Sequence, residues 1–293
     1  VGKRGVEVRC RQGDSKGIVR AMSFIRSLTD QRAAARCVTL SQLAPQGAWQ
    51  LSLLHDRPQH LLIWTTRGQG RVTIEGLRRG VSVHNALFVP AGTLFAYEIG
   101  AQGFGLALEI PTWLPLGLPG SPHHLRLRDN RAQAEITGIL EAMQREQSRA
   151  QPLMAEAQAA QAALASVWLR RQIQLQPAEA RRQTAAETMV QDFCRRVVTG
   201  FRSGQLPGDF ADELGVPMRE LDRVCRDCAG RSADEILTER VVHEARMMLA
   251  RPGLGPADAA ERLGFASTDY FERYLAHHGG GASAAPRRRA AGA

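Results

Sequence analysis

Two stretches in the last third of the chain decide the fold: ADELGVPMRELDRVC (residues 211–225) and AERLGFASTDYFERYL (residues 260–275). Each reads Ala-x-x-Leu-Gly and an apolar residue, followed by a short polar turn and a second apolar segment. The second copy has one extra residue in its turn. The repeat predicts two copies of one helical unit.

Each repeated position has a physical role. The small alanine lets two helices approach closely, and the leucine that follows fills the space between them. Gly215 and Gly264 stand where a helix ends with a left-handed residue. Pro217 and Ser267 suit the start of the next helix. The pattern predicts a helix-turn-helix whose second helix keeps an outer face free for a DNA groove.

One helix is expected to join the two copies. Ser232 and Glu235 fit a capping box, and an apolar face continues through DEILTERVVHEARMMLA (residues 234–250) until Pro252 and Gly253 end it. A rod of roughly 18 residues is about 27 Å long. It can present two recognition helices to successive major grooves, which lie about 34 Å apart. Two copies on such a rod are a far more specific sequence signal of DNA binding than one copy.

The region from about 36 to 110 has a different pattern. Short β-rich runs separated by turns predict a small antiparallel barrel or sandwich. These runs are RCVTLSQL (36–43), AWQLSLL (48–54), HLLIWTTRGQG (60–70), RVTIEGLRRG (71–80), ALFVPAGTLFAYEIG (86–100) and FGLALEI (104–110). Tight turns are expected at Glu75-Gly76 and at Pro90-Ala91-Gly92.

The middle of the chain changes from strand to helix periodicity. TWLPLGLPGSP (112–122) is typical of a loop, and the residues that follow predict two amphipathic helices that form an antiparallel hairpin. We expect a flexible leader at 1–17, a β domain at 18–125, the hairpin at 126–176, a linker at 177–187, a helical domain at 188–285 and a disordered tail at 286–293.

Composition limits the class of protein but does not identify it. The chain has 293 residues, of which 44% are hydrophobic, and carries a net charge of +9. From residue 181 to the end, 17 arginines face 16 acidic residues, so charge alone is no argument for DNA. No apolar run approaches the roughly 20 residues of a membrane helix, and the polar N-terminus shows no signal peptide. We therefore expect a cytoplasmic protein that does not insert into a membrane.

The five cysteines do not suggest a disulfide framework, because their number is odd and they are widely scattered. Cys225 and Cys228 form one C-x-x-C, but no second pair or suitably spaced histidine follows to complete a zinc site. The simpler interpretation is two cysteines on one helix.

Residues 190–289 resemble the DNA-binding domain of the AraC/XylS family of bacterial transcription regulators. The match includes DEILTERVVHEARMMLA, with Arg240 and Ala245 of the family's linking helix, and ADAAERLGF (257–265). The strands resemble the cupin-type effector domain of many members, through HLLIWTTRGQGRVTIEG and NALFVPAGTLFAYEIG. The resemblance implies an α+β chain, with a cupin-like antiparallel β-barrel, a helical hairpin and an all-α double helix-turn-helix. Cys225 and Leu275 depart from the family's usual Phe, and GGGASAAPRRR (279–289) lacks its Tyr.

The resemblance also implies which side chains contact DNA. They are Met218, Arg219, Asp222 and Arg223 on the first recognition helix, and Thr268, Asp269, Tyr270 and Arg273 on the second. Arginine suits guanine or phosphate, and an aspartate can accept from cytosine. The alternative for Arg223 and Arg273 is an ion pair with a local acid such as Asp227 or Glu272.

A metal-dependent cupin has a histidine soon after its Pro-x-Gly turn, and Phe95 stands at that position. No His-x-His precedes it, so we expect no metal, no cofactor and no catalytic residues. Trp64, Phe88, Phe95 and Tyr97 are either core residues or the lining of an effector pocket. His123-His124 is expected to be a solvated pair in the loop.

The expected partners are double-stranded promoter DNA, a small-molecule effector and a second copy bound through the hairpin. RNA polymerase is a further candidate. The main alternative is a cupin-type small-molecule-binding protein or enzyme whose helix-turn-helix tail has degenerated. A helical adaptor for another protein is the third.

Overall fold

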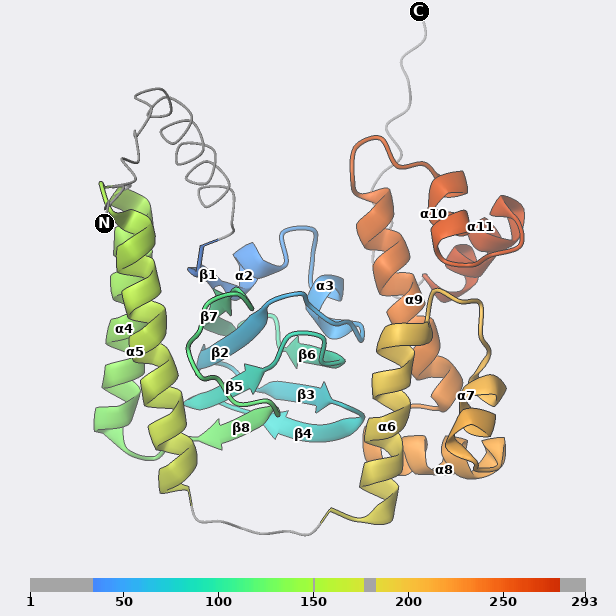
Figure 1. The fold of residues 1–293 in the computed structure, drawn as a ribbon, viewed down its shortest axis with the longest axis horizontal. Coiled ribbons are helices and arrows are strands. Elements are labelled where there is room, and N and C mark those ends of the chain that lie inside the picture. Colours follow the sequence, from blue (N-terminus) through green and yellow to red (C-terminus); the bar gives the residue numbers. More distant parts are fainter. Residues whose placement is uncertain (1–33, 150, 177–182, 280–293) are drawn as a thin grey trace, which may run out of the picture. The chain divides into compact units, whose positions relative to one another are not determined.

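The computed structural model describes residues 34–149, 151–176 and 183–279, and Figure 1 shows its elements in sequence colours. The β region, residues 35–127, contains two antiparallel sheets. The larger sheet has the order β1-β7-β2-β5-β8 and the smaller has the order β4-β3-β6. Their strands are β1 (Arg36–Thr39), β2 (His60–Arg67), β3 (Gly70–Ile74), β4 (Leu77–Val81), β5 (Asn85–Val89), β6 (Phe95–Ile99), β7 (Phe104–Ile110) and β8 (His123–Arg126).

Alternation along the strands divides the apolar residues between two cores. On β2, Leu61 and Ile63 face the small sheet, whereas Leu62 and Trp64 face the opposite way, toward the hairpin. The β3–β4 turn uses the predicted pair, with Glu75 at φ 46° and Gly76 at φ 75°. The expected antiparallel β domain is therefore confirmed, as two facing sheets.

The run AWQLSLL is not a strand, contrary to the sequence prediction. Residues Trp49–Ser52 form the short helix α3, and Leu40–Leu43 form α2 directly after β1. A capping box between Thr39 and Gln42 begins α2. Within α3 the neighbouring residues Gln50 and Leu51 are both buried, which does not follow the alternation of a strand.

The predicted hairpin is present as α4 (Asn130–Arg149) and α5 (Met154–Leu175). Trp168 is fully buried and its indole N–H donates to the Ala132 carbonyl at 3.0 Å, which fixes α5 against α4. The two helices cover the outer face of the larger sheet, where Ile136, Leu140 and Met143 join its core.

The C-terminal helical domain comprises α6 (Ala185–Gly200), α7 (Pro207–Leu214), α8 (Met218–Ala229), α9 (Ala233–Leu249), α10 (Pro256–Arg262) and α11 (Thr268–His278). The helix α6 begins three residues earlier than predicted, because Thr184 and Glu187 form a capping box inside the expected linker. One core runs through all six helices and includes Leu54, Leu94 and Ala96 of the β region. The described residues from Ala35 onward form one compact unit.

His123 and His124 belong to strand β8 rather than to the loop, which corrects the sequence prediction. His124 pairs across the sheet with Leu87, and its imidazole contacts the Asn85 amide oxygen at 2.7 Å. Burial lowers its pKa to about 4. Residues 112–122 form the predicted irregular loop.

Several predicted segments lie outside the described residues. They are the leader at 1–17, linker residues 177–182, and the tail with all of GGGASAAPRRR except Gly279. Within the described part of the chain, no helix is both long and apolar enough to cross a bilayer.

Candidate nucleic-acid interface

The two repeats form two helix-turn-helix units with the same hydrogen bonds. In the first turn, Gly215 has φ 69° and the Val216 N–H donates to the Ala211 carbonyl at 3.1 Å. In the second, Gly264 has φ 75° and the Phe265 N–H donates to the Ala260 carbonyl at 2.9 Å. Both turns therefore end their first helix in the left-handed conformation, as the sequence predicted.

The second helix of each unit is anchored by one side chain and exposed on the other face. Leu221 of α8 and Phe271 of α11 are fully buried. Ser267 caps α11 by accepting from the Tyr270 N–H at 3.2 Å, as expected for a serine at that position. The outer faces of α8 and α11 carry the exposed side chains that a recognition helix needs.

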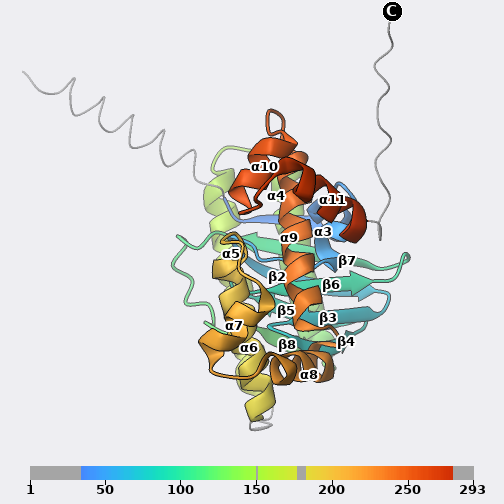
Figure 2. The same cartoon turned by 90° about the vertical axis from the view of Figure 1, so that its right-hand side faces the viewer.

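Helix α9 joins the two units, and Figure 2 shows α7 and α8 at one end of it and α10 and α11 at the other. The predicted capping box is present: the Ser232 hydroxyl accepts from the Glu235 N–H at 3.1 Å, and the Glu235 carboxylate accepts from the Ser232 N–H at 2.6 Å. The helix has 17 residues. It is therefore about 25 Å long.

Most of the residues implied to contact DNA lie on the outer faces of α8 and α11. Arg219, Asp269 and Arg273 are exposed, and Tyr270 has 52% of its surface exposed. Of the ion pairs between described residues, none involves Arg219 or Arg273. Met218, Asp222 and Thr268 are half-buried, and Met218 packs against the core.

Arg223 has the local partner that the alternative interpretation named. Its guanidinium lies 2.9 Å from Asp227, one helical turn away, and both side chains are 62% exposed. Such an exposed pair contributes only about 0.3–0.5 kcal/mol, so DNA phosphate can compete for the arginine.

Asp222 has a structural role that the sequence did not reveal. One carboxylate oxygen accepts from the Ala233 N–H at 3.1 Å, and the other lies 3.0 Å from the Arg226 guanidinium. The side chain thus satisfies a free donor in the first turn of α9 and ties it to α8. Both oxygens are occupied within the chain, which argues against Asp222 as a base-reading residue.

Cys225 and Cys228 lie on α8, as the simpler interpretation expected. Burial raises the pKa of Cys225 to about 12 and raises that of Cys194, which is fully buried, well above its usual value. These sulfurs are therefore protonated and unreactive at neutral pH. Across the described residues, no group of three His, Cys, Asp or Glu side chains is placed to hold a metal ion.

One face of α9 contacts the β region through a buried ion-pair network. Arg240 is 3% exposed, lies 2.7 Å from Asp56 and 3.0 Å from Glu244, and stacks on the Phe201 ring at 3.8 Å. Burial alone would raise the pKa of Glu244, but Arg240 and Arg202 hold it below the usual value. The sequence identified Arg240 only through a family resemblance and did not identify Asp56.

Two stacked histidines lie beside this network. The rings of His55 and His243 are 4.5 Å apart and nearly parallel. His55 donates to the Leu53 carbonyl at 2.9 Å and His243 donates to the Gln50 carbonyl at 3.1 Å. Burial lowers the pKa of His243 to about 4 and that of His55 well below its usual value, with neighbouring arginines adding to the effect. Both rings are therefore neutral at neutral pH.

A cleft of about 800 Å³ opens next to these histidines, between the β region and α9. Five arginines line it against two acids. The arginines are Arg36, Arg57, Arg202, Arg240 and Arg251. Arg251 is exposed and has no acidic partner among the described side chains, and the buried Nδ1 of His243 has no hydrogen-bond partner there either.

The four aromatic residues suggested for an effector pocket are all at most 1% exposed. Trp64 and Phe88 belong to the core against the hairpin, whereas Phe95 and Tyr97 belong to the core between the sheets. None of them lines this cleft. That these rings bind an effector remains a prediction.

A comparison with protein families agrees with the helix-turn-helix predicted from the repeat. Residues 210–288 match a family described as "Helix-turn-helix domain". No curated protein matches the sequence. Among solved structures, ToxT from Vibrio cholerae is 10% identical, with a TM-score of 0.39, over 82% of this chain and 91% of that one.

Two further structures are similar at the same level. ToxT from Vibrio cholerae bound to an unsaturated fatty acid is 9% identical, with a TM-score of 0.42, over 85% of this chain and 94% of that one. The AraC-like transcriptional activator CuxR is 13% identical, with a TM-score of 0.30, over 82% of this chain and 78% of that one.

Proposed function

We propose that this chain, whose C-terminal part is a helix-turn-helix domain of the AraC type, is a transcription regulator that binds two neighbouring major grooves of one DNA duplex. The observation that carries the proposal is the duplicated turn, with equivalent hydrogen bonds around Gly215 and Gly264 at the two ends of α9. A DNA-binding role requires the compartment that holds the chromosome, so a cytoplasmic location is part of the proposal.

Arg219 and Arg273 are the main candidates for contacts with DNA. Each lies on the exposed face of a recognition helix and has no acidic partner among the residues described. An unpaired guanidinium needs no internal bond broken before it binds guanine or phosphate. Tyr270 and Asp269 would contribute at the N-terminal end of α11, and Arg223 after release from Asp227.

The cleft between the β region and α9 is the proposed effector site. Four of its five arginines already have an acidic partner, and Arg251, unpaired among the described residues, is the cation that favours an anion. The free Nδ1 of His243 can accept a hydrogen bond only from a ligand that also carries a hydroxyl or N–H group. A ligand there would contact both Arg57 of the β region and Arg251 near the end of α9. Its binding energy would then depend on how α9 lies on the β region, which is the requirement for effector control.

This location predicts an arginine-dependent ligand. In calorimetric titrations with a panel of sodium carboxylates, from acetate to long-chain and dicarboxylic acids, we expect at least one to bind. Arg251→Ala should weaken that binding roughly 10- to 150-fold, because a charge-assisted hydrogen bond contributes about 1.5–3 kcal/mol. The control is Arg262→Ala, an exposed arginine on α10 outside the cleft. If Arg251→Ala leaves the affinity unchanged, the effector binds elsewhere. The alternative site is then the buried aromatic group of Trp64, Phe88, Phe95 and Tyr97.

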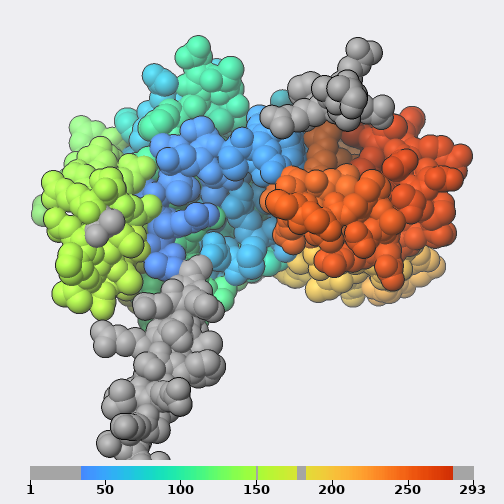
Figure 3. Space-filling view, turned by 90° about the horizontal axis from the view of Figure 1, so that it is seen from above, coloured from blue at the N-terminus to red at the C-terminus, as the bar shows by residue number. Residues whose placement is uncertain are grey.

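The hairpin supports a homodimer. Leu164 and Leu175 are 57% and 74% exposed and lie 11 residues apart, about three helical turns, so they share one face of α5. Leu153, 71% exposed, directly precedes the helix, and we call these three leucines the stripe. Figure 3 shows the hairpin surface, in yellow-green, uncovered on its outer side. Exposed leucines on a helix whose inner face is already buried against the core are the feature expected of a helix that packs on a second copy.

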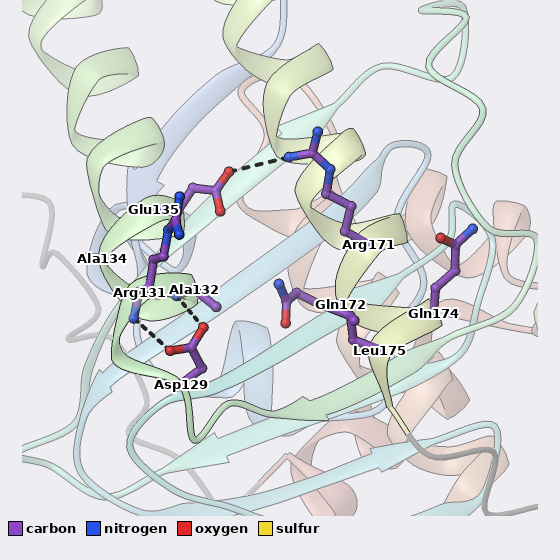
Figure 4. Close-up of a pocket in the computed structure, with 9 residues that line it drawn as sticks. All are labelled: Asp129, Arg131, Ala132, Ala134, Glu135, Arg171, Gln172, Gln174 and Leu175. Atoms are coloured by element: carbon purple, nitrogen blue, oxygen red, sulfur yellow. Dashed lines mark hydrogen bonds and ion pairs between the residues drawn. The ribbon is translucent and has the colours of Figure 1, made fainter.

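One end of this stripe borders an open cleft of about 780 Å³, drawn in Figure 4. Some of its polar groups are already engaged: Asp129 accepts from the Arg131 and Ala132 N–H groups, and Glu135 lies 3.8 Å from Arg171. The cleft lies beside the exposed Leu175, so a side chain of a partner helix packed on this leucine would enter it.

The dimer predicts a specific effect of charge on the stripe. Leu164→Arg should raise the dimer dissociation constant roughly 10- to 100-fold, since burying a leucine contributes about 1.5–3 kcal/mol. Sedimentation velocity over a concentration series measures this. Leu206→Arg is the matched control, because Leu206 is 68% exposed but lies in the C-terminal helical domain. If Leu164→Arg and Leu206→Arg have the same dimer dissociation constant, dimerisation through α5 is contradicted.

A further inference from the structure

The turn of the second helix-turn-helix lies directly against the backbone that precedes the first. A Cβ atom added at Gly264 would lie 2.7 Å from the Arg202 carbonyl oxygen and 2.9 Å from the Gly204 backbone nitrogen. A Cβ added at Gly204 would in turn lie 3.1 Å from the Gly264 carbonyl oxygen. Both glycines have a left-handed backbone, with φ 76° and 75°. We call this the Gly204–Gly264 contact.

The turn itself does not require this closeness. Gly215 occupies the equivalent position in the first unit with φ 69°, yet nothing lies within 4 Å of a Cβ added there. The left-handed conformation explains a glycine at both positions. Only Gly264 additionally touches another part of the backbone, so the contact has a role beyond ending a helix.

The loop that receives Gly264 is held firmly. Arg202 lies 2.8 Å from Glu244 of α9, and the Gln205 amide donates to Glu213 of α7 at 2.7 Å. The Ser203 hydroxyl donates to the Gly200 carbonyl at 2.7 Å. The loop is thus tied to α6, α7 and α9 and forms a fixed surface for the second turn.

Little else joins the two units directly. Helices α10 and α11 pack mainly on each other and on α9. Beside the contact lies a cleft of about 420 Å³, bordered by Phe201, Leu206, Phe265 and Tyr270 rather than filled by them. The second unit is therefore positioned by α9, by the core that all six helices share, and by the direct backbone contact between Gly204 and Gly264.

We propose that the Gly204–Gly264 contact fixes the orientation of α11 relative to α8, and thereby the spacing of DNA half-sites that the protein accepts. This inference rests on the proposed DNA-binding function. Gly264 is then a specificity-determining residue that does not itself touch DNA. A methyl group there must push the second unit away from the loop, because the atoms it meets are backbone and cannot turn aside.

The test compares Gly264→Ala with Gly215→Ala in the full chain. Both place alanine at a positive φ, but only the first also meets neighbouring backbone. A two-half-site duplex is first selected from random DNA with the wild-type protein. Affinities are then measured for that duplex, for versions lengthened or shortened by one and two base pairs between half-sites, and for a single half-site.

We expect Gly264→Ala to lower the preference for the selected spacing at least about tenfold, which is comparable to losing one base contact, while single-half-site affinity is kept. Gly215→Ala should keep the wild-type preference. If Gly264→Ala does not fold, Gly204→Ala, with its milder 3.1 Å contact, takes its place. A folded variant with the wild-type spacing preference would overturn the inference. Failure of the wild type to select any DNA would instead overturn the proposed function.

Discussion

Replacing Arg240 with alanine is expected to lower the free energy of unfolding of the full chain by about 3–5 kcal/mol, as for other buried pairs that lose one partner. The side chain is 3% exposed and holds two carboxylates, of which Glu244 keeps Arg202 as a second partner. Asp56 has only Arg240 among its described ion pairs, so its charge is left without compensation at the contact between the β region and α9.

Urea denaturation monitored by circular dichroism measures this effect. Arg223→Ala is the matched control, because it also removes one arginine from an ion pair, but one whose side chains are 62% exposed. It should cost about 0.3–0.5 kcal/mol. Combining Arg240→Met with Asp56→Asn should recover part of the loss, since the unpaired charge is then removed. If Arg240→Ala costs no more than Arg223→Ala, the network does not hold α9 on the β region.

Arg219→Ala is expected to weaken sequence-specific DNA binding by about 1–3 kcal/mol, or roughly 5- to 150-fold, if the guanidinium binds a guanine. The residue lies in the first turn of α8, is exposed and has no acidic partner among the described residues. Removing it breaks no internal ion pair, so the fold should be unaffected. Gel shifts on a duplex selected by the wild type, at fixed salt, measure the change.

The salt dependence distinguishes the kind of contact. Loss of a phosphate contact lowers affinity for all sequences alike and reduces the slope of log affinity against log salt by about one. Loss of a base contact instead relaxes specificity at one position. Arg145→Ala, which removes the same charge from the hairpin, is the control. Unchanged affinity of Arg219→Ala relative to Arg145→Ala would remove Arg219 from the interface.

Features set by local backbone chemistry could be predicted from the sequence. The left-handed conformations of Gly215 and Gly264, the Ser232–Glu235 capping box and the Glu75-Gly76 turn depend on residues within a few positions of each other. Such patterns leave few alternatives for the backbone. The double helix-turn-helix was predictable for the same reason, because each copy repeats its own turn and anchor.

Features set by distant contacts could not be predicted. Asp222 has a side chain that could read a base, and only the fold shows that it accepts from the Ala233 N–H at the start of α9. AWQLSLL alternates like a strand, but Trp49–Ser52 form the helix α3, which packs beside β6. The pairing of Arg240 with Asp56 joins residues 184 positions apart. The Gly204–Gly264 contact likewise gives no local pattern, since glycine at 264 is already explained by its turn.

Hydroxyl-radical footprinting of the wild-type protein on its selected duplex tests the central claim most directly. Two recognition helices on one rod of about 25 Å should protect two patches on the same face of the DNA, about one helical turn or 10–10.5 base pairs apart. That result would support binding by both motifs to neighbouring major grooves. A single protected patch, or two patches on opposite faces of the duplex, would contradict it.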